Sequence, residues 1–106
     1  MPASVYQNDT GKPFEWALQY SDLSIPDLSG LTNPNFAVSF YNGTSSTGGT
    51  GTFSVFGDPK KGIVHYQQLA AEVATVAASI TPFVTVTFPN GPVTFSGDFF
   101  AIVAKH

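Results

Sequence analysis

The sequence of 106 residues predicts an all-β domain, an antiparallel β-sandwich with one short helical crossover. Three observations lead to this prediction. Apolar and polar residues alternate with a period of two, which is typical of strands that bury one face. Clusters of Gly, Pro, Asn and Asp separate the alternating segments, as short turns require. Hydrophobic residues make up 42% of the chain and include ten phenylalanines, enough for the core of one domain over residues 1–106.

The alternation is clearest in segments 14–20, 36–41, 52–56 and 79–88. Their inward-facing side chains form the predicted core, which includes Trp16, Phe36, Val38, Phe40, Phe53, Val55, Val84, Val86 and Phe88. Pro82 interrupts the fourth segment. Because proline has no amide to donate, we expect its nitrogen to face away from the hydrogen-bond ladder or to lie at an edge.

Shorter apolar segments predict further strands at Val5–Tyr6, Ile63–Tyr66, Val93–Phe95 and Phe100–Ala104. The alanine-rich segment YQQLAAEVATVAA, residues 66–78, breaks the β pattern because Leu69, Val73 and Val76 recur at helical spacing. It is too short for an independent helix, so it predicts a helical turn or two that cross between the sheets. Seven or eight short strands with one such crossover are typical of an immunoglobulin-like sandwich, here without its cysteine pair.

Two turn regions carry specific expectations. The segment NGTSSTGGTG, residues 42–51, predicts a flexible loop between the strands that flank it. In TFPNGPVTF, residues 87–95, Asn-Gly between apolar segments predicts a hairpin, but Pro92 cannot donate the amide that would close a two-residue turn after Gly91. We therefore expect a four-residue loop whose ladder closes at Phe88 and Val93. A tip without amide donors also cannot extend pairing to another chain.

Charge is scarce and unevenly distributed. Only 10% of residues are charged, against about 25% in an ordinary soluble domain. No charge occurs from Leu28 to Gly57 or from Val73 to Gly97. Two interpretations stay open: a neutral surface rich in Ser, Thr and Asn that is wetted by solvent, or a surface that other subunits cover. The net charge of −3 and the lack of arginine argue against nucleic-acid binding.

The chain is poor in catalytic and metal-binding residues. Without cysteine it can form neither a disulfide nor a thiolate metal site. His65 falls on the outward side of a short strand without sequence neighbours that could share a metal, and no nucleophile elbow or triad is present. A calcium site at Asp22 and Asp27 is an alternative, although their spacing matches no compact calcium loop. We predict a protein that is not an enzyme and has no cofactor or metal.

The amino-terminal segment and the hydropathy of the chain predict where the protein is located. No run of 18 apolar residues is present, and the segment MPASVYQNDTG lacks the apolar centre of a signal peptide. We therefore expect a protein that is made in a cytoplasm without a targeting signal and does not act at a membrane.

Five motifs occur in a familiar order: VYQNDTGKPF, IPDLSG, DPKKGIVHY, AAEVAT and FVTVTFPNGPVTF. In their order and spacing, from Val5 to Ile102, they resemble the amino-terminal immunoglobulin-like domain of phage baseplate upper proteins, a module that recurs in tail-associated structural proteins. The resemblance implies a non-enzymatic attachment or assembly module of the tail or baseplate in a bacteriophage virion. It implies other virion structural proteins as partners, with multiple copies per particle, and no catalytic residues.

Three aromatic side chains fall on outward faces and are candidate partner contacts: Tyr41, Phe56 and Phe83. Aromatic residues are enriched in interface cores while Asp, Glu and Lys are depleted, so we expect at least one of them to contact a neighbouring virion subunit. Two alternatives stay open. The chain could be a capsid decoration (cement) protein, or a small carbohydrate-binding module in which Trp16 or Tyr41 stacks on a sugar ring.

Overall fold

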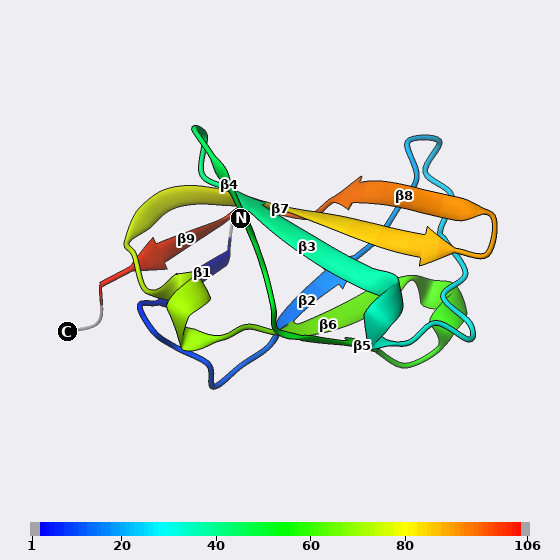
Figure 1. Ribbon diagram of the computed structural model, residues 1–106, viewed down its shortest axis with the longest axis horizontal. Coiled ribbons are helices and arrows are strands. Elements are labelled where there is room, and N and C mark those ends of the chain that lie inside the picture. Colours follow the sequence, from blue (N-terminus) through cyan, green and yellow to red (C-terminus); the bar gives the residue numbers. More distant parts are fainter. Residues whose placement is uncertain (1–2, 105–106) are drawn as a thin grey trace.

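The computed structural model describes residues 3–104, which form nine strands in two sheets and three short 3-10 helices (Figure 1). The strands are β1 (Ala3–Tyr6), β2 (Phe14–Ala17), β3 (Phe36–Tyr41), β4 (Ser46–Gly48), β5 (Thr52–Val55), β6 (Ile63–Gln67), β7 (Ala77–Phe88), β8 (Gly91–Ser96) and β9 (Phe100–Val103). The helices are η1 (Asn33–Asn35), η2 (Pro59–Lys61) and η3 (Ala70–Val73). The larger sheet has the order β1-β9-β7-β3-β4 with β8 also paired to β7, and the smaller sheet has the order β2-β6-β5.

The long strand β7 organises the larger sheet because it pairs with three partners. One side of β7 pairs with β3, whereas the other pairs first with β9 and then with β8. Pro82 lies where the second side changes partner, and its carbonyl accepts a hydrogen bond from the amide of Gly97 at 2.9 Å. In an antiparallel ladder, the backbone nitrogen and the carbonyl oxygen of one residue face the same neighbouring strand. The missing amide of Pro82 therefore falls at the junction of β8 and β9.

The two sheets pack face to face around one apolar cluster. Seven of the nine predicted core residues are buried, and Val55 and Phe88 are half-buried against the same cluster. Aromatic rings connect the sheets: the ring centroids of Trp16 and Phe40 lie 6.3 Å apart, and those of Phe36 and Phe53 lie 5.3 Å apart. The fold is thus all-β, with a core contributed by both sheets, and is compatible with a β-sandwich.

The predicted antiparallel pairing is wrong for one pair of strands. β1 runs parallel to β9, with Val5 opposite Ile102, so the larger sheet is mixed. A tight hairpin forces two strands to be antiparallel, whereas a parallel pair needs a long connection. Nearly the whole domain separates β1 from β9, and nothing local to either strand sets their relative direction.

The helical crossover is shorter than the spacing of its apolar residues predicted. Only η3, a single 3-10 turn, links β6 of the smaller sheet to β7 of the larger one. Val73 is buried, but Leu69 and Val76 are exposed, so the predicted helical stripe is wrong. The segment is too short to gain from helix propagation, and β7 already begins at Ala77.

Two turns differ from the expectations. Part of the predicted flexible loop forms β4, which pairs with β3 after a turn in which the Asn42 side chain accepts the amides of Thr44 and Ser45. The second hairpin closes at Phe88 and Gly91 around a two-residue turn, so the predicted four-residue loop is wrong. Pro89 occupies the first central position, which favours its fixed φ. The ladder can continue past Pro92 because β8 is an edge strand.

Candidate functional site

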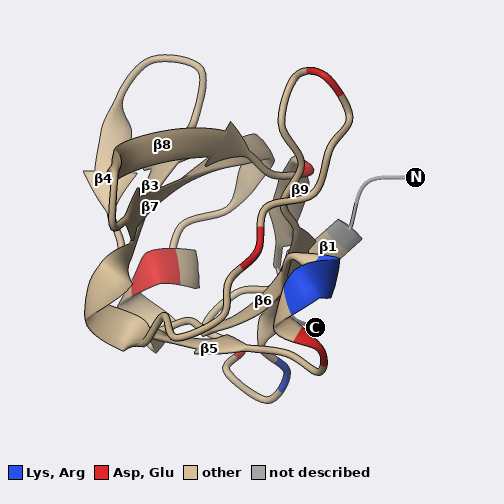
Figure 2. Ribbon diagram, turned by 90° about the vertical axis from the view of Figure 1, so that its right-hand side faces the viewer, with Lys and Arg blue, Asp and Glu red and all other residues tan. Residues whose placement is uncertain are grey.

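The main candidate surface is the outer face of four adjacent strands in the larger sheet, in the order β8, β7, β3 and β4. We call it the neutral face. The two charge-free segments of the sequence meet here, although β3 begins at Phe36 and β7 begins only at Ala77. Figure 2 shows that these four ribbons carry no charged residue, while the charged residues lie elsewhere on the described chain. The outward residues are Ala37, Ser39, Tyr41, Ser46, Gly48, Thr81, Phe83, Thr85, Thr87, Pro92, Thr94 and Ser96.

The centre of the neutral face is a half-buried aromatic ring among hydroxyl groups. Phe83 on β7 lies opposite Ser39 on β3 and Ser96 on β8. In the next row of the sheet, the hydroxyls of Thr85 and Thr94 lie 2.9 Å apart and form a hydrogen bond. The face therefore presents small, neutral side chains around one large apolar group.

The structure brings together two of the three predicted contact residues. Tyr41 lies diagonally across from Phe83 on the neutral face and is 38% exposed. Phe56 follows β5 on the other sheet, is 48% exposed, and stacks on the ring of His65 with a centroid distance of 4.1 Å. Contact of Tyr41, Phe56 or Phe83 with a partner stays a prediction. Phe56 belongs to a different surface from the other two.

The histidine and the two aspartates considered as site residues, His65, Asp22 and Asp27, make local structural contacts. His65 lies 2.9 Å from Glu15, its partner across β2 and β6, in an exposed pair of the kind that contributes about 0–1 kcal/mol. Asp22 and Asp27 each bond within their own turn, where Ser24 and Ser29 lower the pKa of the respective carboxyl through side-chain and backbone hydrogen bonds. Within residues 3–104, no three His, Asp or Glu side chains are grouped so that they could hold a metal ion.

Glu72 is the most heavily hydrogen-bonded acid described. Its Oε1 accepts the hydroxyl of Tyr66 at 2.8 Å and the amide of Leu69 at 3.1 Å, while its Oε2 accepts the amide of Thr50 at 2.6 Å. The Tyr66 oxygen accepts the amide of Gly51 at 2.8 Å. This carboxylate therefore links η3 to the chain segment that leads into β5. Burial, and then the hydrogen bond to Glu72, raises the pKa of Tyr66 well above its ordinary value.

The raised pKa of Tyr66 predicts a loss of stability at high pH. The unfolded tyrosine ionises near pH 10, while the folded one stays neutral to a higher pH. The contribution of Tyr66 is therefore complete below about pH 10 and falls as the pH rises further. We expect the melting temperature of the protein to fall between about pH 9.5 and 11.5 more steeply than that of Tyr66→Phe. Parallel curves for the two proteins would contradict the buried, neutral hydroxyl.

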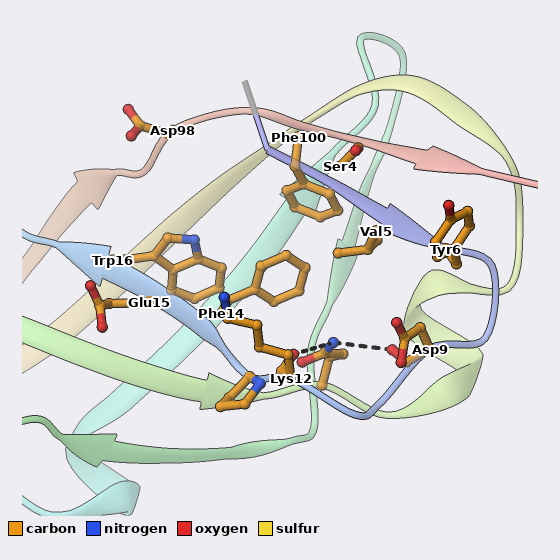
Figure 3. Close-up of a pocket in the computed structure, with 12 residues that line it drawn as sticks. Ser4, Val5, Tyr6, Asp9, Lys12, Phe14, Glu15, Trp16, Asp98 and Phe100 are labelled. Carbon is orange, nitrogen blue, oxygen red and sulfur yellow. Dashed lines mark hydrogen bonds between the residues drawn. The ribbon is translucent and has the colours of Figure 1, made fainter. Parts of the chain in front are cut away.

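A cavity of about 480 Å³ opens between β1 and β9 on one side and β2 on the other. Figure 3 shows the rings of Phe14, Trp16 and Phe100 gathered in it, with Asp9 and Asp98 at opposite ends. Trp16 is only 4% exposed and stacks against Phe14 and Tyr66. Trp16 therefore offers no ring face to a sugar. Of the two residues suggested for sugar stacking, Tyr41 alone has an exposed ring.

The loop between β2 and β3 carries an exposed apolar tip that the sequence pattern did not predict. Leu23 is 73% exposed and Ile25 is 51% exposed. We call this pair the apolar tip. Leu23 has a φ of +72°, a left-handed conformation that costs a residue with a side chain roughly 1–2 kcal/mol. The repeated Asp-x-Ser pattern of DLSIPDLS was the available signal, because such side chains bond the backbone two residues on and shape a tight loop.

Comparison with known proteins found no match: no family model, no curated protein and no solved structure matches this chain. The resemblance to the baseplate domains therefore stays a prediction from the sequence. In the part of the chain that the structure describes, no helix has the length and apolar character needed to span a membrane.

Proposed function

We propose that this chain is a non-enzymatic structural protein of a bacteriophage virion, an immunoglobulin-like attachment and assembly module of the tail or baseplate. The neutral face is the observation that carries the proposal. It spans four strands and presents no charge to solvent. Interface cores are depleted in Asp, Glu and Lys and enriched in aromatic residues. The presence of both Tyr41 and Phe83 on this face supports a contact with other virion subunits.

The strand edges support contact through the face rather than through added strands. β8 is an edge strand that contains Pro92, and β4 is an edge strand of three residues. Proline and short length both protect an edge against pairing with another chain. A protein present in many copies in one particle needs such protection, because uncontrolled pairing would join the copies into fibrils.

The location of the protein in a particle tests the proposal directly. Intact particles would be labelled with a gold-conjugated antibody against this chain and viewed by electron microscopy. We expect gold at the tail or baseplate. Label over the head would favour the capsid decoration alternative. If the preparation contains the free protein but the particles carry no label, a virion role is contradicted.

A charge placed on the neutral face should block incorporation. Thr94 and Thr52 are both exposed threonines on edge strands, β8 and β5, but they lie on opposite sheets. We expect Thr94→Glu to reduce the number of copies per particle by about tenfold or more, because assembly would bury its carboxylate without a partner. Thr52→Glu is the matched control and should be incorporated normally.

Quantitative mass spectrometry of purified particles measures this difference. Both free variants should melt within a few degrees of the wild-type protein, since neither threonine lies in the core. Equal incorporation of the two variants would show that the neutral face is not the contact surface.

A further inference from the structure

We propose that the cavity between β1, β9 and β2 binds a small aliphatic diamine, a chain of methylene groups with an ammonium at each end. This site is independent of the virion role proposed above and goes beyond it. We call it the aromatic cavity, after the rings of Phe14, Trp16 and Phe100 that line it. Three features carry the assignment: a buried acceptor without a partner, an apolar centre and an acid at each end.

The first feature is a buried amide oxygen that lacks a donor. Gln68 lines the aromatic cavity and is only 2% exposed. Its Nε2 donates to the carbonyls of Asp9 and Lys12, each at 3.1 Å, and dashed lines in Figure 3 mark these bonds. Its Oε1 is the one buried side-chain oxygen or nitrogen without a partner in residues 3–104, although buried acceptors are nearly always paired. A ligand with an N–H donor would supply the missing bond.

The second feature is the apolar centre of the cavity. The ring centroids of Phe14 and Phe100 lie 4.5 Å apart, and those of Phe14 and Trp16 lie 5.4 Å apart. The cavity volume of about 480 Å³ is typical of a site for a small molecule. Methylene groups gain free energy when they leave water for such a surface, and aromatic rings attract ammonium groups.

The third feature is the position of the acids. Asp9 and Asp98 line the cavity at opposite ends, as Figure 3 shows. Gln68 is bonded at the Asp9 end, so one ammonium there would donate to Oε1 of Gln68 and to the Asp9 carboxylate. The second ammonium would pair with Asp98. A monoamine leaves one acid unpaired, and an anion meets like charge at both ends.

Two further charged side chains line the cavity, Glu15 and Lys12. Glu15 pairs with His65 at 2.9 Å on the outer face of the smaller sheet, so we do not count it among the acids of the site. Lys12 is exposed, and its ammonium repels a cationic ligand. Its removal should therefore strengthen binding, whereas removal of the Asp98 charge should weaken it.

Fluorescence of the single tryptophan detects occupation of the site, because Trp16 lines the cavity. Titration with putrescine, cadaverine and hexamethylenediamine would find the preferred chain length. We expect saturable one-to-one binding, confirmed by calorimetry. The best diamine should bind at least about tenfold more tightly than the monoamine of the same length. Added salt should weaken the binding, because both ends of the ligand make ionic contacts.

Asp98→Asn and Asp22→Asn form a matched pair of variants. Both aspartates are exposed and each change removes one negative charge, but Asp22 lies outside the cavity. We expect Asp98→Asn to bind the diamine at least about fivefold more weakly and Asp22→Asn to bind it like the wild type. Lys12→Met should bind it more tightly. All three variants should melt within a few degrees of the wild-type protein, since these side chains lie outside the core.

Nuclear magnetic resonance tests the contact with Gln68. When the diamine is bound, the side-chain amide resonances of Gln68 should shift clearly. Those of Gln19, an exposed glutamine outside the cavity, should not shift. Unchanged Gln68 resonances in the presence of bound diamine would reject the site.

Three other results would overturn it: no saturable binding of any diamine up to millimolar concentration, equal affinity for a diamine and its monoamine, or equal weakening by Asp98→Asn and Asp22→Asn. The last result would show non-specific attraction of cations to a protein of net charge −3. None of these results bears on the virion role, because the gold-labelled particles and the Thr94→Glu variant test that role separately.

Discussion

Val86→Asp should lower the free energy of unfolding by about 3–5 kcal/mol, the largest effect that we expect from a single substitution. Val86 is fully buried in β7, between Phe36 on β3 and Val93 on β8. A carboxylate there has no charged or hydrogen-bonding partner, and the loss of two methyl groups also leaves the core less well packed. Urea denaturation followed by circular dichroism measures the change.

The next residue provides the control. Thr87 is exposed and faces outward from the same strand, so Thr87→Asp should change the free energy of unfolding by no more than about 1 kcal/mol. If Val86→Asp melts within a couple of degrees of the wild type, the assignment of inward and outward faces along β7 is wrong. If both variants lose the same free energy of unfolding, the cause is the low strand propensity of aspartate rather than the burial of its charge.

The second large effect is expected at Glu72. Glu72→Ala leaves the buried hydroxyl of Tyr66 without its acceptor and frees the amides of Leu69 and Thr50. An unpaired buried donor costs about 1–3 kcal/mol, so we expect a total loss of roughly 2–4 kcal/mol in the free energy of unfolding. Glu72→Gln keeps one acceptor oxygen, so its loss in the free energy of unfolding should be smaller.

Glu15→Ala is the matched control for the loss of a carboxylate. Glu15 is exposed and bonds only to His65 among its described partners, so its removal should cost no more than about 1 kcal/mol. Amide hydrogen exchange at Thr50 and Gly51 gives a second measurement. Exchange there should accelerate in Glu72→Ala and not in Glu15→Ala. Equal stability of the two variants would contradict a clamping role for Glu72.

The alternation of apolar residues determined most of the fold without tertiary information. Together with the shorter apolar segments, it predicted strands at eight of the nine observed positions. The alternation itself identified core residues such as Phe40, Val84 and Val86, because a period of two leaves a side chain only two faces. The charge-free segments were equally visible in the sequence. Of the surface aromatics, Tyr41, Phe56 and Phe83 could be named, but their grouping could not.

Only the tertiary structure decided which distant segments meet. The parallel pairing of β1 with β9, the union of two uncharged segments in the neutral face, and the clamp between Glu72 and Thr50 all join residues far apart in the chain. The strained backbone of Leu23 also escaped the sequence, because leucine rarely adopts a positive φ on its own. The local sequence pattern indicates which face of a segment is buried. The packing of the whole sheets determines which segments become its neighbours and where its backbone is strained.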